Sequence, residues 1–219
     1  LQLWHMGRIV HPDYLDGQPP VSASATTAPD HAHTPTGRKP HAQSRAATLA
    51  DIARIVDDYA KAAANAKAAG FDGVQLHGAN GYLVDQFLRL STNLRDDDFG
   101  GSPENRVRFM DQILARLVEV WGNDRVSIRL SPNGETQGCD DPDPALIFAE
   151  AARVCQRHGL GFVELRQPGP NGTFGATEVP KQDALIRANY TGPLVLNSDY
   201  TAAEAEADVA SGRCEAISF

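Results

Sequence analysis

Short apolar runs alternate with helical patterns along most of the chain, and this alternation limits the fold more than any other feature. Helices are expected at 48–69, 102–121, 143–158, 178–189 and 201–211, and strands at 1–5, 73–76, 125–130, 162–165, 193–196 and 216–219. Glycine, proline or a capping residue punctuates these segments. Alternating strands and helices predict a parallel sheet with right-handed crossovers.

An open doubly wound sheet and a closed (β/α)8 barrel both fit this order. No Gly-x-Gly-x-x-Gly follows any expected strand, although dinucleotide-binding open sheets usually carry it. Polar residues do stand at or just after the ends of different strands, namely His5, His77, Arg129, Arg166 and Asn197. Barrel enzymes distribute their sites in this way, so the barrel is favoured.

The barrel is expected to be incomplete, with about six of the eight strands in residues 1–219. We therefore expect a single partial barrel domain, with missing barrel segments before Leu1 and after Phe219. Residues 6–47 are rich in proline, glycine and histidine, and only Val21–Thr26 is expected to pair there as a short strand. A loop of this length inside a compact domain is usually functional.

Composition excludes several classes of partner. The net charge is −8 and basic residues are at most adjacent pairs, which argues against nucleic acid and anionic membranes. Neither a signal peptide nor an apolar run near the ~20 residues of a membrane span is visible. The three cysteines are scattered without metal-binding spacing, so we expect reduced thiols in a cytoplasmic protein and no metal.

The stretch Val74–Tyr82 carries the main candidate site. An apolar run ends at His77, and Asn80 and Tyr82 follow at the turn into a helix. A neutral imidazole and a carboxamide each offer an N–H to one oxygen, and a tyrosine hydroxyl can act as an acid. The alternative for His77 is a core histidine bonded to a backbone carbonyl. The three side chains together favour a site that binds an oxygen and delivers a proton.

Arg129 stands inside the apolar run Val126–Leu130. A charge in a barrel interior has to be paired, because burying it alone is unfavourable. Glu164 is the obvious acidic mate in the neighbouring strands. Two interpretations stay open: Arg129 faces a bound anion or polarised oxygen, or it forms a structural pair with Glu164.

Several segments resemble the Old Yellow Enzyme family of flavin-dependent ene reductases, which fold as (β/α)8 barrels. The resemblance is carried by His77–Leu88, Ser91–Arg95, Phe99–Arg106, Gln2–Arg8 and Arg129–Pro132. Glu164–Arg166 and Asn197–Thr201 are most similar to the branch that includes N-ethylmaleimide and glycerol trinitrate reductases.

The resemblance implies FMN at the barrel mouth and NAD(P)H as hydride donor, in a ping-pong cycle. By position, it implies that Gln2, Arg129, His77 and Ser198 contact the cofactor. It also implies that His77 and Asn80 bind the oxygen of an activated alkene, that Trp4 shapes the substrate pocket, and that Tyr82 protonates the α-carbon. Enones, maleimides, nitroalkenes and nitrate esters are the expected small-molecule substrates.

The chain departs from the family at the seventh-strand phosphate loop, where Asn197, Ser198 and Asp199 replace the glycines of many relatives. The first strand and the phosphate-binding turn of the family are expected outside residues 1–219, so this chain alone should bind FMN weakly. Two other functions stay open. The chain could be the barrel of a larger, dienoyl-CoA reductase-like flavin oxidoreductase, or a non-catalytic barrel remnant.

Overall fold

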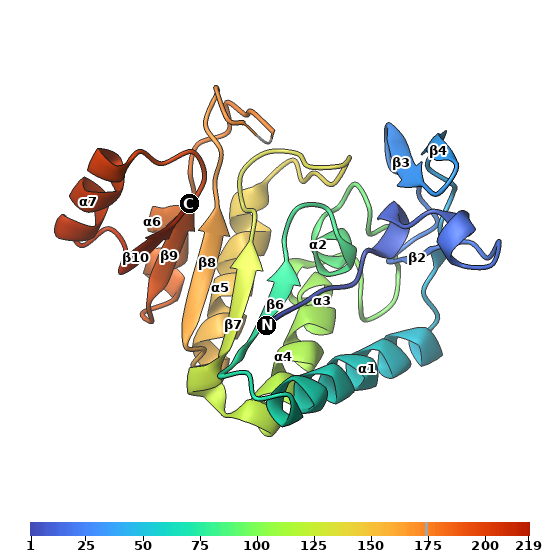
Figure 1. Ribbon diagram of the computed structural model, residues 1–219, viewed down its shortest axis with the longest axis horizontal. Coiled ribbons are helices and arrows are strands. Elements are labelled where there is room, and N and C mark those ends of the chain that lie inside the picture. Colours follow the sequence, from blue (N-terminus) through green and yellow to red (C-terminus); the bar gives the residue numbers. More distant parts are fainter. Residues whose placement is uncertain (174) are drawn as a thin grey trace.

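A computed structural model describes residues 1–173 and 175–219. Its centre is a six-stranded parallel sheet in which the strands follow one another in chain order (Figure 1). These strands are β1 (Gln2–Leu3), β6 (Val74–Gly78), β7 (Val126–Leu130), β8 (Phe162–Arg166), β9 (Leu194–Asn197) and β10 (Ala216–Ser218). Sequential parallel pairing is the arrangement predicted for part of a barrel.

Helices connect the strands and cover one face of the sheet (Figure 1). They are α1 (Leu49–Ala68), α2 (Leu83–Leu88), α3 (Pro103–Arg106), α4 (Arg108–Trp121), α5 (Pro144–His158), α6 (Asp183–Asn189) and α7 (Ala202–Ala210). Three short 3-10 turns add η1 (Gly7–Ile9), η2 (Pro12–Tyr14) and η3 (Asn123–Arg125).

The predicted helix boundaries are set by capping residues. Thr48 and Asp51 form a complete capping box at the start of α1, as their spacing predicts. Asp143 caps α5, and Gly159 ends that helix in the left-handed conformation that glycine adopts readily. The expected helix from Ser102 is divided at Val107 into α3 and α4.

The core lies between the sheet and α1, α4 and α5. The apolar stripe of α1 includes Ile52 and Ile55, which are almost fully buried, and α1 packs on α4. Phe109 of α4 stacks on Phe87 of α2 with ring centroids 4.2 Å apart. Burying each such side chain stabilises the fold by roughly 1.5–3 kcal/mol.

The expectation for residues 6–47 was wrong in part. β2 (Val21–Ser22) lies at the start of the expected strand, but it pairs with β5 (Arg45–Ala46). β3 (His31–Thr34) and β4 (Gly37–Pro40) also form an antiparallel hairpin, which projects at the far end of the molecule from α7 (Figure 1). Glycine and proline have low strand propensity, so the hairpin depends on its two-residue turn, which is followed by Gly37 with a positive φ of 114°.

Other boundaries also differ from expectation; the strand expected at 1–5, for example, is only Gln2–Leu3. His77 lies within β6 instead of after it, because β6 pairs with β7 as far as Gly78. α6 begins at Asp183, and residues 178–182 are not helical, since Pro180 lacks the N–H of a helix interior. None of the helices described combines the length and the apolar character that crossing a bilayer requires.

Candidate active site

The turn after β6 holds the three predicted site residues. His77 is 6% exposed near the end of β6, Asn80 occupies the turn, and Tyr82 is the N-cap residue of α2. The rings of His77 and Tyr82 lie 5.3 Å apart between centroids. Trp4, just after β1, makes edge contacts with Tyr82 at 4.7 Å and with His77 at 6.0 Å. The structure therefore brings all four of these residues together.

His77 is neutral near pH 7. Burial lowers the pKa of its imidazole to about 4, and the positive charge of Arg129 acts in the same direction. Its Nδ1 atom is buried and has no hydrogen-bond partner among the described residues. His77 therefore does not donate a hydrogen bond from this atom to a backbone carbonyl of the described residues, as the alternative of a core histidine would require. A neutral imidazole with a free nitrogen can bind a ligand oxygen through one N–H.

Asn80 is held by its backbone, and its carboxamide has no partner among the described residues. Its φ is +60°, a left-handed conformation that asparagine tolerates better than most residues. Its N–H donates to Ser131 Oγ at 2.8 Å, and its carbonyl accepts from Gln137 Nε2 at 2.7 Å. The buried Oδ1 atom makes no hydrogen bond within the described residues. The side chain is thus positioned and unpaired.

A buried ion pair in and just after α2 holds this turn in place through hydrogen bonds. Asp85 and Arg89 are each 1% exposed and are joined by a 3.0 Å bond between Arg89 Nε and Asp85 Oδ1. Asp85 Oδ2 accepts from the N–H of Gly81 at 2.9 Å and from Ser131 Oγ at 3.4 Å, and Arg89 donates to the carbonyl of Ser131. This pair is not among the site residues expected from the sequence. Its signal in the sequence is a charged i,i+4 pair within residues 83–90, where Gln86 is the one other polar residue.

Arg129 pairs with Glu164, which was the structural alternative left open by the sequence. Its Nη1 donates to Glu164 Oε1 at 2.9 Å, and its Nη2 donates to Asn197 Oδ1 at 2.7 Å. Nε has no described partner, and the residue also faces the cavity. The structural pair and exposure of Arg129 to a ligand thus occur together.

Glu164 links this pair to the remaining strands. Its Oε2 accepts from Gln75 Nε2 at 2.9 Å, and Gln75 in turn accepts from Gln2 at 2.6 Å. Ser218 Oγ also donates to Glu164 Oε1 at 2.9 Å, and the Ser218 carbonyl accepts from Asn197 at 2.9 Å. One hydrogen-bonded chain, which we call the six-strand network, therefore takes one residue from each strand of the sheet. Gln2 reaches the site through this network.

A cavity of about 870 Å³ opens at the carboxyl ends of β6 to β9. Its lining includes Asn80, Tyr82, Arg129, Arg166, Asn197, Ser198 and Asp199. Trp4, His77 and Gln2 are not among the lining residues; the first two adjoin it through Tyr82. Ser198 and Asp199 have positive φ values of 121° and 52°. Glycine would adopt such values with less backbone strain.

The residues of this cavity fit the flavin cofactor that the resemblance implies. Its volume lies in the range of about 300–1,000 Å³ typical of cofactor sites. Arg129 and Arg166 each carry a buried nitrogen without a described partner, which suits an anionic ligand. No group of three or more His, Cys, Asp or Glu residues in the described part of the chain is arranged to hold a metal ion.

Comparison with protein families gives one match over the whole chain. The model of the NADH:flavin oxidoreductase / NADH oxidase family matches residues 1–219. Putative 12-oxophytodienoate reductase 5 of Oryza sativa subsp. japonica is 35% identical over 221 residues, covering 100% of this chain and 58% of that protein. A probable flavin mononucleotide-dependent alkene reductase of Leishmania infantum is 36% identical over 181 residues, covering 83% of this chain and 48% of that protein.

Solved structures confirm the fold class. The old yellow enzyme homologue from Zymomonas mobilis superposes with a TM-score of 0.96 at 47% identity, over 100% of this chain and 61% of that one. Morphinone reductase gives 0.92 at 36% identity, over 100% and 60%. The chain therefore has the parallel (β/α)8 barrel architecture in incomplete form, and it spans about 60% of these proteins.

Proposed function

Because the chain belongs to the NADH:flavin oxidoreductase / NADH oxidase family, we propose that the protein is an FMN-dependent NAD(P)H:alkene oxidoreductase of the Old Yellow Enzyme type. Its substrates are alkenes activated by an electron-withdrawing group, such as enones, maleimides and nitroalkenes, with nitrate esters as further candidates. The similar Leishmania infantum protein, described as a probable alkene reductase, supports the reduction of C=C bonds.

One observation carries the proposal: Asn80, with its unpaired carboxamide, and Tyr82 line the cavity that Arg129 also lines, and the neutral His77 packs against the Tyr82 ring. In this proposal His77 and Asn80 donate hydrogen bonds to the carbonyl or nitro oxygen of the substrate. Those bonds withdraw electron density from the alkene, so its β-carbon accepts a hydride more readily. Trp4 limits the width of the substrate pocket through its contacts with Tyr82 and His77.

When bound, FMN supplies the hydride for the alkene after taking it from NAD(P)H. The residues proposed to hold FMN are Gln2, Arg129, His77 and Ser198. In this proposal Arg129 places a positive charge beside the flavin ring, which becomes negatively charged when it is reduced. Glu164 and Asn197 hold the guanidinium in place by accepting hydrogen bonds from Nη1 and Nη2. Tyr82 holds the proton that the α-carbon of the alkene receives, because its ring lies 5.3 Å from the His77 ring between centroids and a tyrosine hydroxyl can act as a general acid.

The proposal extends to organisation and location. We propose that residues 1–219 form a single, partial flavin-binding barrel domain, supported by the sheet and core that run through the described chain. We also propose a cytoplasmic location and a relationship to N-ethylmaleimide and glycerol trinitrate reductases. The three buried free cysteines suit a reducing compartment.

An absorbance experiment tests this function. The purified full-length protein should show the visible bands of oxidised flavin, lose them anaerobically with NADPH or NADH, and regain them when an enone is added. Comparing the two nicotinamides gives the preferred donor. A full-length protein without flavin bands would contradict the proposal and favour a non-catalytic barrel.

A further inference from the structure

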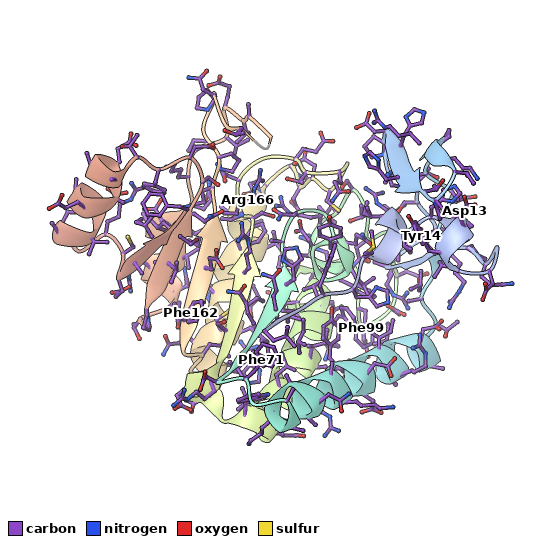
Figure 2. The ribbon with its side chains drawn as sticks, in the orientation of Figure 1. Asp13, Tyr14, Phe71, Phe99, Phe162 and Arg166 are labelled. Carbon is purple, nitrogen blue, oxygen red and sulfur yellow. The ribbon has the colours of Figure 1, made fainter. Side chains whose placement is uncertain are left out.

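Arg166, the last residue of β8, is a buried cation that the proposed chemistry does not use. It is 7% exposed, and its side chain lines the cavity at the carboxyl end of the sheet (Figure 2). Its side chain forms no hydrogen bond or ion pair with any described residue, and its Nη1 atom is fully buried. A guanidinium stays protonated in proteins, so this site cannot be neutralised by losing a proton.

The charges around Arg166 do not balance it. Arg129, across the same cavity wall, is already paired with Glu164. The acidic side chain that acts on the pKa of Arg166 is Asp199, whose carboxylate instead accepts from the N–H of Thr173 at 3.2 and 3.3 Å. Burial and the positive charge of Arg129 both lower the pKa of Arg166, which shows that its surroundings disfavour the cation. A counter-anion from outside the protein would remove that penalty.

We propose that Arg166 binds an anionic group, a phosphate or a carboxylate, of the molecule that fills the cavity. The planar guanidinium can donate two parallel N–H bonds to such a group. The proposal rests on the proposed function only for the identity of that molecule.

The position of Arg166 narrows the choice of ligand. β8 lies two places from β6 in the sheet, so the ends of these strands are roughly 10 Å apart. The anionic group therefore lies well away from the oxygen bound at His77 and Asn80. Two sources meet this requirement: the phosphate at the end of the ribityl chain of FMN, and an acidic group on the tail of a long substrate.

Phosphate binding by the flavin-free full-length protein is the first test. Inorganic phosphate should raise the thermal midpoint of the wild type and of Arg153→Gln, an exposed arginine on α5 that serves as the matched control. The increase should be markedly smaller in Arg166→Met. Without phosphate, Arg166→Met should be at least as stable as the wild type, because it removes an unpaired buried charge. Lower stability with an undiminished phosphate effect would overturn the proposal.

Flavin affinity then identifies the source. If the anion is the cofactor phosphate, Arg166→Met should bind FMN about 10- to 100-fold more weakly, by the usual strength of a charged hydrogen bond. Binding of riboflavin, which lacks the phosphate, should not change, and Arg166→Lys should recover part of the loss. Both dissociation constants are measured by quenching of flavin fluorescence.

If FMN affinity is unchanged, the substrate is the remaining source. The KM of an enone that bears a distant carboxylate should then rise about 10- to 100-fold in Arg166→Met, while the KM of its methyl ester stays constant. No change in FMN affinity and none in either KM would refute the proposal. A wild type that binds no flavin would refute the proposed function instead, and the phosphate response would still decide the role of Arg166.

Discussion

Acid should destabilise the flavin-free protein through His77. The folded state lowers the pKa of this imidazole from 6.5 to about 4, first by burial and then by the charge of Arg129. An unfolded chain takes up the proton near pH 6.5, so between pH 6.5 and 4 the unfolded state binds more protons. The free energy of unfolding therefore falls as the pH falls through this window.

The size of the effect follows from the two pKa values. Their difference corresponds to about 3 kcal/mol, fully developed only below pH 4. At pH 5.0 about 2 kcal/mol is already lost, and at pH 7.5 almost none. Urea denaturation at these two pH values should show that wild type loses about 2 kcal/mol more than His77→Gln, which has no imidazole to protonate.

Comparison with the variant separates His77 from other groups that titrate in the same range. His5, for example, is also buried, and burial lowers its pKa, but it is present in both proteins. His33→Gln is the matched control at an exposed position on β3 and should keep the wild-type pH dependence. Equal losses in wild type and His77→Gln would refute the reasoning from burial.

Three further predictions concern the site and the core. Tyr82→Phe should slow the reduction of an enone while leaving the reduction of the flavin by NADPH intact, measured as separate half-reactions by stopped flow; equal loss of both would contradict the role of Tyr82 as proton donor. His77→Ala should raise the KM of the enone, and an unchanged KM would rule out the hydrogen bond from His77 to the substrate oxygen. Asp85→Ala should lower the free energy of unfolding by about 3–5 kcal/mol, because Arg89 is left as an uncompensated buried charge. A loss below about 1 kcal/mol in urea denaturation would show that the pair is not a buried ion pair in solution.

The regular elements could be predicted because their signals are local. The capping box of Thr48 and Asp51 and the apolar spacing that follows define α1 within a few residues of the chain. The strands of the sheet are short apolar runs that alternate with helices along the chain, and this alternation predicts parallel pairing. The β3–β4 hairpin was missed because its stability depends on pairing and a two-residue turn, and its residues are poor strand formers.

The site was predictable in part, for a similar reason. His77, Asn80 and Tyr82 are close in sequence, and their residue types already indicate hydrogen bonding and acid chemistry. The contacts that hold Asn80 come from Ser131 and Gln137, more than 50 residues away along the chain. The pairing of Arg129 was left undecided because sequence alone cannot state whether a buried charge meets its protein mate or a ligand. The structure shows that Arg129 is paired with Glu164 and that it also lines the cavity.

The six-strand network restricts the order in which this protein can change during evolution. Glu164 is the acceptor for three donors on three different strands, Gln75, Arg129 and Ser218. Replacing Glu164 first would leave the partly buried guanidinium of Arg129 without its carboxylate, whereas replacing Arg129 first would leave the buried carboxylate of Glu164 without its cation. Viable mutational paths must therefore alter these positions in compensating pairs. Substitutions at the six strands should show strong epistasis, even though the residues lie far apart in sequence.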